Sequence, residues 1–139
     1  MKTLIVGTGV IGTIYGWALA EAGVDVTHYL RPGKKTSDIM EVKLDVLDER
    51  QGHKPNNLTQ YAMRCVDSVK PEDRYELIIL PVNANQLEDV LTTLAPCSGQ
   101  AIFLTLTSNW EGTAILDAHL PQDRYLLGYA DGGGTVRDG

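Results

Sequence analysis

The chain has 139 residues, of which 43% are hydrophobic and 22% charged, and this length and composition fit one globular domain. Its net charge of -6 at pH 7 argues against general binding to nucleic acids or anionic membranes, because like charges repel. Cys65 and Cys97 stand apart, without a CxxC spacing, and predict neither a metal site nor a disulfide framework. We expect a cytoplasmic protein, since the sequence shows no leader pattern and no apolar run of about 18 residues.

Short apolar segments alternate with segments of helical periodicity along the whole chain. The predicted strands are residues 3–6, 24–30, 41–46, 64–66, 77–80, 101–104 and 125–128, and the predicted helices are residues 10–22, 86–94 and 113–119. A polar turn is expected at 52–57. This alternation predicts an α/β fold with a Rossmann-type, doubly wound, mainly parallel sheet, formed by a single domain over residues 1–139.

The first predicted strand runs into a glycine motif with GxGxxG spacing, Gly7-Thr8-Gly9-Val10-Ile11-Gly12. Gly7 permits a tight turn, Gly9 lets the backbone approach a pyrophosphate, and Gly12 lets the following helix pack against the sheet. The N–H groups at the start of that helix favour an anion. Because a buried strand precedes the motif and a helix follows it, we expect a dinucleotide site rather than a flexible turn without a ligand.

The residues after the second predicted strand bear on which dinucleotide is bound. Enzymes that use NAD usually place Asp or Glu there to bind the ribose 2′-hydroxyl, whereas this chain has Arg31, followed by Lys34 and Lys35. Asp25 lies at the opposite end of the same strand. A guanidinium can hold a 2′-phosphate through two hydrogen bonds, so the pattern favours NADP over NAD, with a solvated basic turn as the alternative.

Four further stretches complete an ordered set with the glycine loop. They are Leu-Arg-Pro-Gly at 30–33, Leu-Pro-Val-Asn-Ala-Asn-Gln at 80–86, Thr-Ser-Asn-Trp-Glu-Gly at 107–112 and Arg-Asp-Gly at 137–139. On this set, over essentially its whole length, the chain resembles the N-terminal domain of ketopantoate reductase, also called 2-dehydropantoate 2-reductase. The resemblance implies an NADP(H)-binding domain of an oxidoreductase that reduces a 2-oxo acid, ketopantoate or a related substrate, by hydride transfer in the pathway to pantothenate.

The resemblance also implies a second, helical domain that supplies the catalytic lysine and that this chain does not contain. We therefore expect cofactor binding and little catalysis from the chain alone. Its expected partners are the dinucleotide and a small 2-oxo acid, with a homodimer as a candidate assembly and no metal.

Three residues match positions that lie beside the cofactor in the family: Val82, Asn83 and Asn109. Asn109, beside the nicotinamide and the substrate, is also the candidate catalytic residue of this chain. Two positions depart from the family: Asn83 stands where a lysine is usual, and Trp110 replaces a glycine. These departures leave open a different 2-oxo substrate, or a non-catalytic module that senses NADP. A different Rossmann dehydrogenase, of the opine or hydroxyacid type, is a third alternative.

Overall fold

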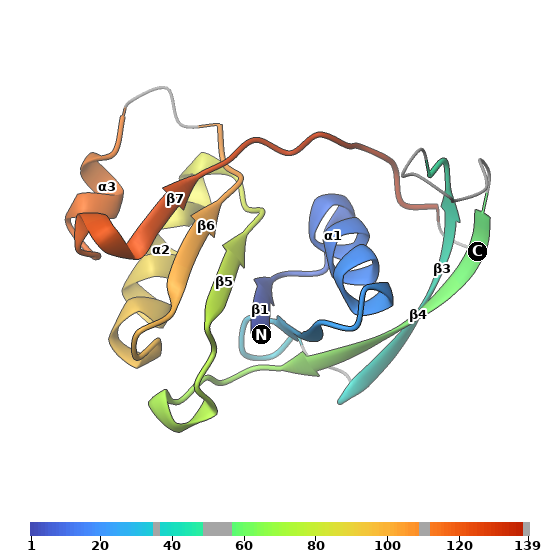
Figure 1. Ribbon diagram of the computed structural model, residues 1–139, viewed down its shortest axis with the longest axis horizontal. Helices are drawn as coiled ribbons and strands as arrows, with labels where there is room; N and C mark the ends of the chain where they lie inside the picture. Colours follow the sequence, from blue (N-terminus) through green and yellow to red (C-terminus); the bar gives the residue numbers. More distant parts are fainter. Residues whose placement is uncertain (35–36, 49–56, 109–111, 138–139) are drawn as a thin grey trace.

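The computed structural model describes residues 1–34, 37–48, 57–108 and 112–137 (Figure 1). The strands are β1 (Lys2–Val6), β2 (Asp25–Tyr29), β3 (Ile39–Val46), β4 (Asn57–Val66), β5 (Leu77–Leu80), β6 (Ile102–Thr105) and β7 (Tyr125–Leu127). The helices are α1 (Val10–Glu21), α2 (Ala84–Leu94) and the single-turn α3 (Ala114–Asp117). Among the described residues, no helix has the length and apolar character needed to cross a membrane.

The described strands form one sheet in the order β3-β4-β2-β1-β5-β6-β7. Every neighbouring pair is parallel except β3 and β4, which pair antiparallel. From β1 the chain first moves to β2 on one side and later to β5 on the other, so the strand order reverses beside β1. The predicted doubly wound, mainly parallel α/β sheet is confirmed, and such a reversal is where open α/β sheets bind ligands.

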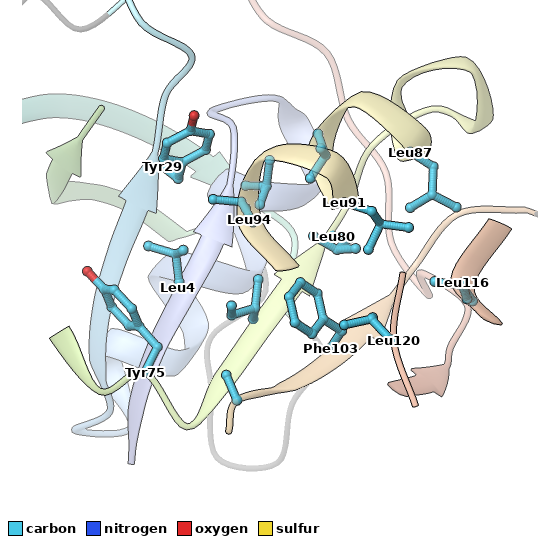
Figure 2. Packing of buried hydrophobic residues seen from close by; sticks show 14 residues of the cluster. Leu4, Tyr29, Tyr75, Leu80, Leu87, Leu91, Leu94, Phe103, Leu116 and Leu120 are labelled. Atoms are coloured by element: carbon cyan, nitrogen blue, oxygen red, sulfur yellow. The ribbon is translucent and has the colours of Figure 1, made fainter. Parts of the chain in front are cut away.

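Helices cover both faces of the sheet. Trp17 of α1 packs with buried side chains of β4, and Leu19 of α1 packs on Ile5 and Val26. On the opposite face α2 and α3 enclose the largest apolar cluster, which Figure 2 shows around Phe103.

Helix α2 shows why this face is stable. Its buried residues Leu87, Val90, Leu91 and Leu94 recur at helical spacing and form one apolar stripe. Each fully buried leucine contributes about 1.5–3 kcal/mol relative to an exposed one. The helix is therefore fixed against β5 and β6, and its N-terminus is fixed at the edge of the sheet where β5 ends.

The structure extends several predicted elements and shortens others. Strand β4 begins at Asn57 rather than at residue 64, because Tyr61, Met63 and Cys65 alternate as buried residues with exposed neighbours. The predicted turn at 52–57 therefore ends in a strand, and its residues 52–56 lie outside the described part. Helix α3 is one turn, shorter than the predicted 113–119. Helix α2 starts at Ala84, two residues ahead of the predicted helix.

The segment after β7 has no regular secondary structure as far as Arg137 and crosses α1 (Figure 1). The N–H of Asp131 donates to the hydroxyl of Tyr15 at 3.2 Å. A Cβ on Gly134 would lie 3.2 Å from Val10 Cγ1, so a glycine lets the backbone approach the helix closely.

Candidate functional site

A cleft of about 580 Å³ opens at the carboxyl ends of β1, β2 and β5, where the strand order reverses. It is lined by the first loop (Val6, Gly7, Thr8, Gly9, Val10, Ile11), the end of β2 and its turn (Tyr29, Leu30, Arg31, Lys34), Met40 of β3, and the β5–α2 segment (Pro81, Val82, Asn83, Gln86, Asp89, Val90). A smaller cavity of about 260 Å³ shares Ile11, Pro81, Val82 and Asn83 with it. The described residues that the sequence predicts to bind the cofactor therefore line one cleft. Gly12 is the exception, since it lies behind the loop and does not line the cleft.

Each glycine of the loop has a distinct geometric role. Gly7 has a φ of 89°, a left-handed conformation that favours glycine. Gly9 has no atom within 4 Å of the place where a Cβ would stand, so its backbone is open to an approaching group. A Cβ on Gly12 would lie 3.2 Å from the Gly7 oxygen and 3.3 Å from Pro81 Cγ, so the glycine lets the helix pack closely against the loop and Pro81. The geometry fits a loop that turns tightly and leaves room for a phosphate group.

The start of α1 presents unpaired donors to this cleft. The first intrahelical bond runs from Thr13 N–H to the Gly9 oxygen at 2.9 Å, so the N–H groups of residues 10–12 have no acceptor within the helix. No described side chain caps this end, and the first turn carries no acidic residue. The positive end of the helix dipole is therefore available to an anion.

A basic turn follows β2 at the mouth of the cleft. The N–H of Lys34 donates to the Arg31 oxygen at 3.0 Å, and Gly33 has a φ of 82°, as a tight turn of type II requires. Both basic side chains are exposed and line the cleft. Asp25 lies at the other end of β2, where its Oδ1 is 2.8 Å from Arg64 Nη1, so this carboxylate is turned to another partner.

Asn83 stands at the N-cap of α2 and lines both cavities. Its backbone N–H donates to Gln86 Oε1 at 3.3 Å, and its backbone carbonyl oxygen accepts from the Gln86 N–H at 2.9 Å. Both of these bonds use backbone atoms of Asn83, so they hold the helix start in place without involving its side-chain amide.

The loop after β6 borders the smaller cavity. Thr107 Oγ1 donates to the Val82 oxygen at 2.7 Å, which ties this loop to the one after β5. Ser108 lines the cavity. The predicted site residue Asn109 and its neighbour Trp110 follow directly in the chain and lie outside the described residues, as does Lys35.

Some lining residues were not predicted from the sequence: Met40, Gln86, Asp89 and Ser108. Gln86 and Asp89 are three residues apart at the start of α2, a spacing that places them on one side of a helix. That spacing, directly after a strand that ends at the ligand edge, is the signal that could have found them. Met40 had no such signal, since its place depends on how β3 pairs with β4.

The family model of ketopantoate reductase PanE/ApbA matches residues 3–138 of the chain. No curated protein matches this chain. Among solved structures, D-mandelate dehydrogenase with NADH and anilino(oxo)acetate is 21% identical, with a TM-score of 0.73 over 93% of this chain and 40% of its own. The 2-dehydropantoate 2-reductase of Geobacter metallireducens is 18% identical, with a TM-score of 0.69 over 91% and 40%.

A third structure, the dimeric ketopantoate reductase of Staphylococcus aureus, is 15% identical, with a TM-score of 0.66 over 99% of this chain and 46% of its own. The chain thus spans less than half the length of the solved proteins it matches. Similarity at these identities shows a shared fold.

Proposed function

The chain belongs to the ketopantoate reductase PanE/ApbA family, and we propose that it is the NADP(H)-binding domain of an oxidoreductase that reduces a 2-oxo acid. The observation that carries the proposal is the cleft at the strand-order reversal, lined by the glycine loop on one side and by Arg31 on the other. The solved structure of D-mandelate dehydrogenase holds NADH and an oxo acid, which supports a nicotinamide dinucleotide together with an oxo acid as the class of ligands.

The choice of NADP over NAD rests on the basic turn. Arg31 and Lys34 line the cleft next to the end of β2, and a guanidinium can bind a 2′-phosphate through paired hydrogen bonds. A hydroxyl of NAD at the same place would leave two cations without an anionic partner. Asp25, the acidic residue of β2, lies at the opposite end and contacts Arg64, which leaves it no role in binding a ribose.

The bound cofactor would supply the hydride that reduces the substrate carbonyl. The chain's own residues would hold it: Gly7 to Ile11 the pyrophosphate, with Gly12 packing the helix behind them, Arg31 the 2′-phosphate, and Val82 with Asn83 the nicotinamide end. Asn109 lies outside the described residues, and we propose it as the catalytic residue because it matches the family asparagine that lies beside the nicotinamide and the substrate. A helical domain outside this chain would supply the lysine that donates the proton.

A second candidate function is a non-catalytic module that senses NADP. Asn83 favours it, because an N-cap asparagine that bonds with Gln86 supplies no cation where the family usually has a lysine. The parent protein's sequence after residue 139 discriminates: a helical domain with a lysine supports the reductase, and a chain that stops there supports the module.

We also propose a homodimer in a cytoplasmic setting for the parent protein. The solved ketopantoate reductase of Staphylococcus aureus is dimeric. Sedimentation of the parent protein at several concentrations would test the assembly, and a mass that stays monomeric throughout would exclude it.

The experiment that tests dinucleotide binding is a fluorescence titration of the chain with NADPH, alongside the variant Gly9→Ala. The backbone at Gly9 has a φ of -69°, which alanine adopts without strain, so folding is retained while the methyl group enters the open space of the cleft. We expect the variant to bind NADPH about tenfold more weakly, a loss of about 1.4 kcal/mol.

Gly132→Ala is the matched control, since a Cβ there also meets no atom within 4 Å and the residue does not line the cleft. We expect it to bind as the unchanged chain does. The proposal is wrong if the unchanged chain shows no saturable binding, or if Gly9→Ala binds NADPH with unchanged affinity.

A further inference from the structure

His28 is a fully buried polar residue in the middle of the sheet. It lies on β2 with no exposed surface, on the face that α1 covers. Its Nδ1 is 2.9 Å from the carbonyl oxygen of Gly7, and its Nε2 is 3.0 Å from the hydroxyl of Tyr61 on β4. One side chain thus connects the first residue of the glycine loop with a strand two places away from β1.

The partners determine where the protons of the ring lie. A carbonyl oxygen can only accept, so Nδ1 carries a hydrogen and donates it to Gly7. Burial lowers the pKa of His28, which favours the neutral ring. In a neutral ring protonated on Nδ1, Nε2 is an acceptor, so Tyr61 donates its hydroxyl hydrogen to it. Burial raises the pKa of Tyr61 to about 12, so this hydroxyl keeps its hydrogen.

The contact with His28 orients a peptide group of the loop. The Gly7 N–H donates to the Tyr29 oxygen at 2.8 Å, so both backbone polar groups of Gly7 are bound by neighbouring residues of β2. In a trans peptide the carbonyl and the next N–H point in opposite directions, and the described chain contains no cis peptide. Because the Gly7 carbonyl points at the buried ring, the Thr8 N–H points away from it. Thr8 itself lines the cleft.

The packing of α1 is adapted to this ring. A Cβ on Gly16 would overlap His28 Nε2 and lie 2.8 Å from His28 Cε1, closer than real Cβ atoms come, and it would make a tight contact of 3.0 Å with the Tyr61 hydroxyl. The rings of His28 and Tyr61 meet edge to face, with centroids 5.8 Å apart. Gly16, His28 and Tyr61 therefore form one buried unit from α1, β2 and β4.

We propose that His28 is a positioning residue for the glycine loop, and that Tyr61 holds its ring in place. By fixing the Gly7 carbonyl, His28 directs the Thr8 N–H toward the cleft, where a dinucleotide pyrophosphate would accept a hydrogen bond from it. This inference rests on the proposed dinucleotide site, and it adds a residue that touches neither the cofactor nor the substrate.

Two amide variants separate the two contacts of the ring. In His28→Asn the side-chain nitrogen falls at the position of Nδ1 and can still donate to Gly7. In His28→Gln the amide reaches the position of Nε2, so it can bond to Tyr61 but not to Gly7. Both are neutral and polar, and NADPH titration at a temperature where every variant is folded compares them directly.

We expect His28→Asn to bind NADPH within about twofold of the unchanged chain, and His28→Gln about tenfold more weakly, as the loss of one hydrogen bond would produce. Amide exchange at Thr8 should be faster in His28→Gln than in His28→Asn. A merely structural role would lower the stability of both variants without separating their affinities.

Equal NADPH affinities in the two variants would overturn the inference alone, whereas an unchanged chain that binds no dinucleotide would overturn the proposed function as well. Nitrogen NMR of the unchanged chain gives a test that needs no variant. We expect the His28 ring to carry its hydrogen on Nδ1, and a ring protonated on Nε2 alone would contradict the inference.

Discussion

The backbone N–H of Lys34 donates to the carbonyl oxygen of Arg31 at 3.0 Å, so one tight turn holds two cations at the mouth of the cleft. The turn follows β2 after one residue, Leu30, and Pro32 and Gly33 are its two central residues. A proline fixes the φ of the first central position, and Gly33 supplies the positive φ of the second. The placement of both charges is thus a property of the local sequence.

We expect Arg31→Ala to weaken NADPH binding about tenfold or more while NADH binding changes less than about twofold, because only NADPH offers a phosphate to the guanidinium. Parallel titrations with the two dinucleotides give the measurement. Lys70→Ala is the control: this exposed residue precedes β5 at the opposite edge of the sheet, and its loss changes the net charge equally. Equal weakening of NADPH and NADH binding by Arg31→Ala would remove the residue from its proposed role.

The core beneath the site gives a prediction on stability. Leu91 of α2 has no exposed surface and packs in the largest apolar cluster, so Leu91→Ala should lower the free energy of unfolding by about 2–5 kcal/mol. Leu58→Ala removes the same atoms from a residue that is 82% exposed and should change it by less than about 0.5 kcal/mol. Urea denaturation measures both, and similar losses would mean that α2 does not pack as described.

Gly16 gives a prediction in which two effects oppose each other. Alanine favours a helix over glycine by about 1 kcal/mol, but its methyl group would enter the space of the His28 and Tyr61 rings. Because both rings are buried and held by each other, we expect the strain to exceed the gain and Gly16→Ala to cost about 1–2 kcal/mol net.

In a His28→Ala background the obstructing imidazole is gone, so Gly16→Ala should cost about 1 kcal/mol less than it does in the unchanged chain. The double-mutant cycle is measured by urea denaturation. Costs that simply add would show that the two residues are not in contact.

The pH dependence of stability follows from the lowered pKa of His28. Its ordinary value is 6.5, and burial lowers it in the folded chain, so below about that pH the unfolded state binds more protons than the folded state. The stabilising contribution is thus fully present above pH 6.5 and is lost as the pH falls through the pKa of the folded state. His28→Asn removes this titration and leaves the other ionisable groups in place.

We therefore expect the unchanged chain to lose more stability than His28→Asn between pH 7.5 and pH 5.0, as measured by urea denaturation at each pH. Because both chains carry all the other ionisable groups, the difference between their curves isolates the contribution of His28. Parallel stability curves would show that the buried ring titrates normally.

Much of the fold followed from the sequence because each element carries a signal within its own few residues. The apolar run of β5 and the helical stripe of α2 are complete local patterns. The first half of β4 was missed because its buried residues Tyr61 and Met63 are not β-branched, although they alternate with exposed neighbours. That alternation is a local signal, and a stricter search for a two-residue period would find it.

Some residues of the candidate site could likewise be predicted from local sequence, and others depend on how distant strands pair. The glycine loop and Arg31 follow from a motif and its place after a strand. The link from Tyr61 through His28 to Gly7 joins residues 33 and 21 positions apart, and it exists because β4 pairs with β2. His28 lies within the predicted strand 24–30, and no local pattern in the sequence shows which groups its ring contacts.

The ratio of the dissociation constants of NADPH and NADH for the unchanged chain, measured at one salt concentration, decides which dinucleotide the cleft prefers. We predict that both bind at one shared site and that NADPH binds at least about tenfold more tightly, a difference of about 1.4 kcal/mol. That preference should shrink as salt screens the 2′-phosphate from the basic turn. Equal binding of the two, or tighter binding of NADH, would contradict the assignment of this cleft to NADP(H).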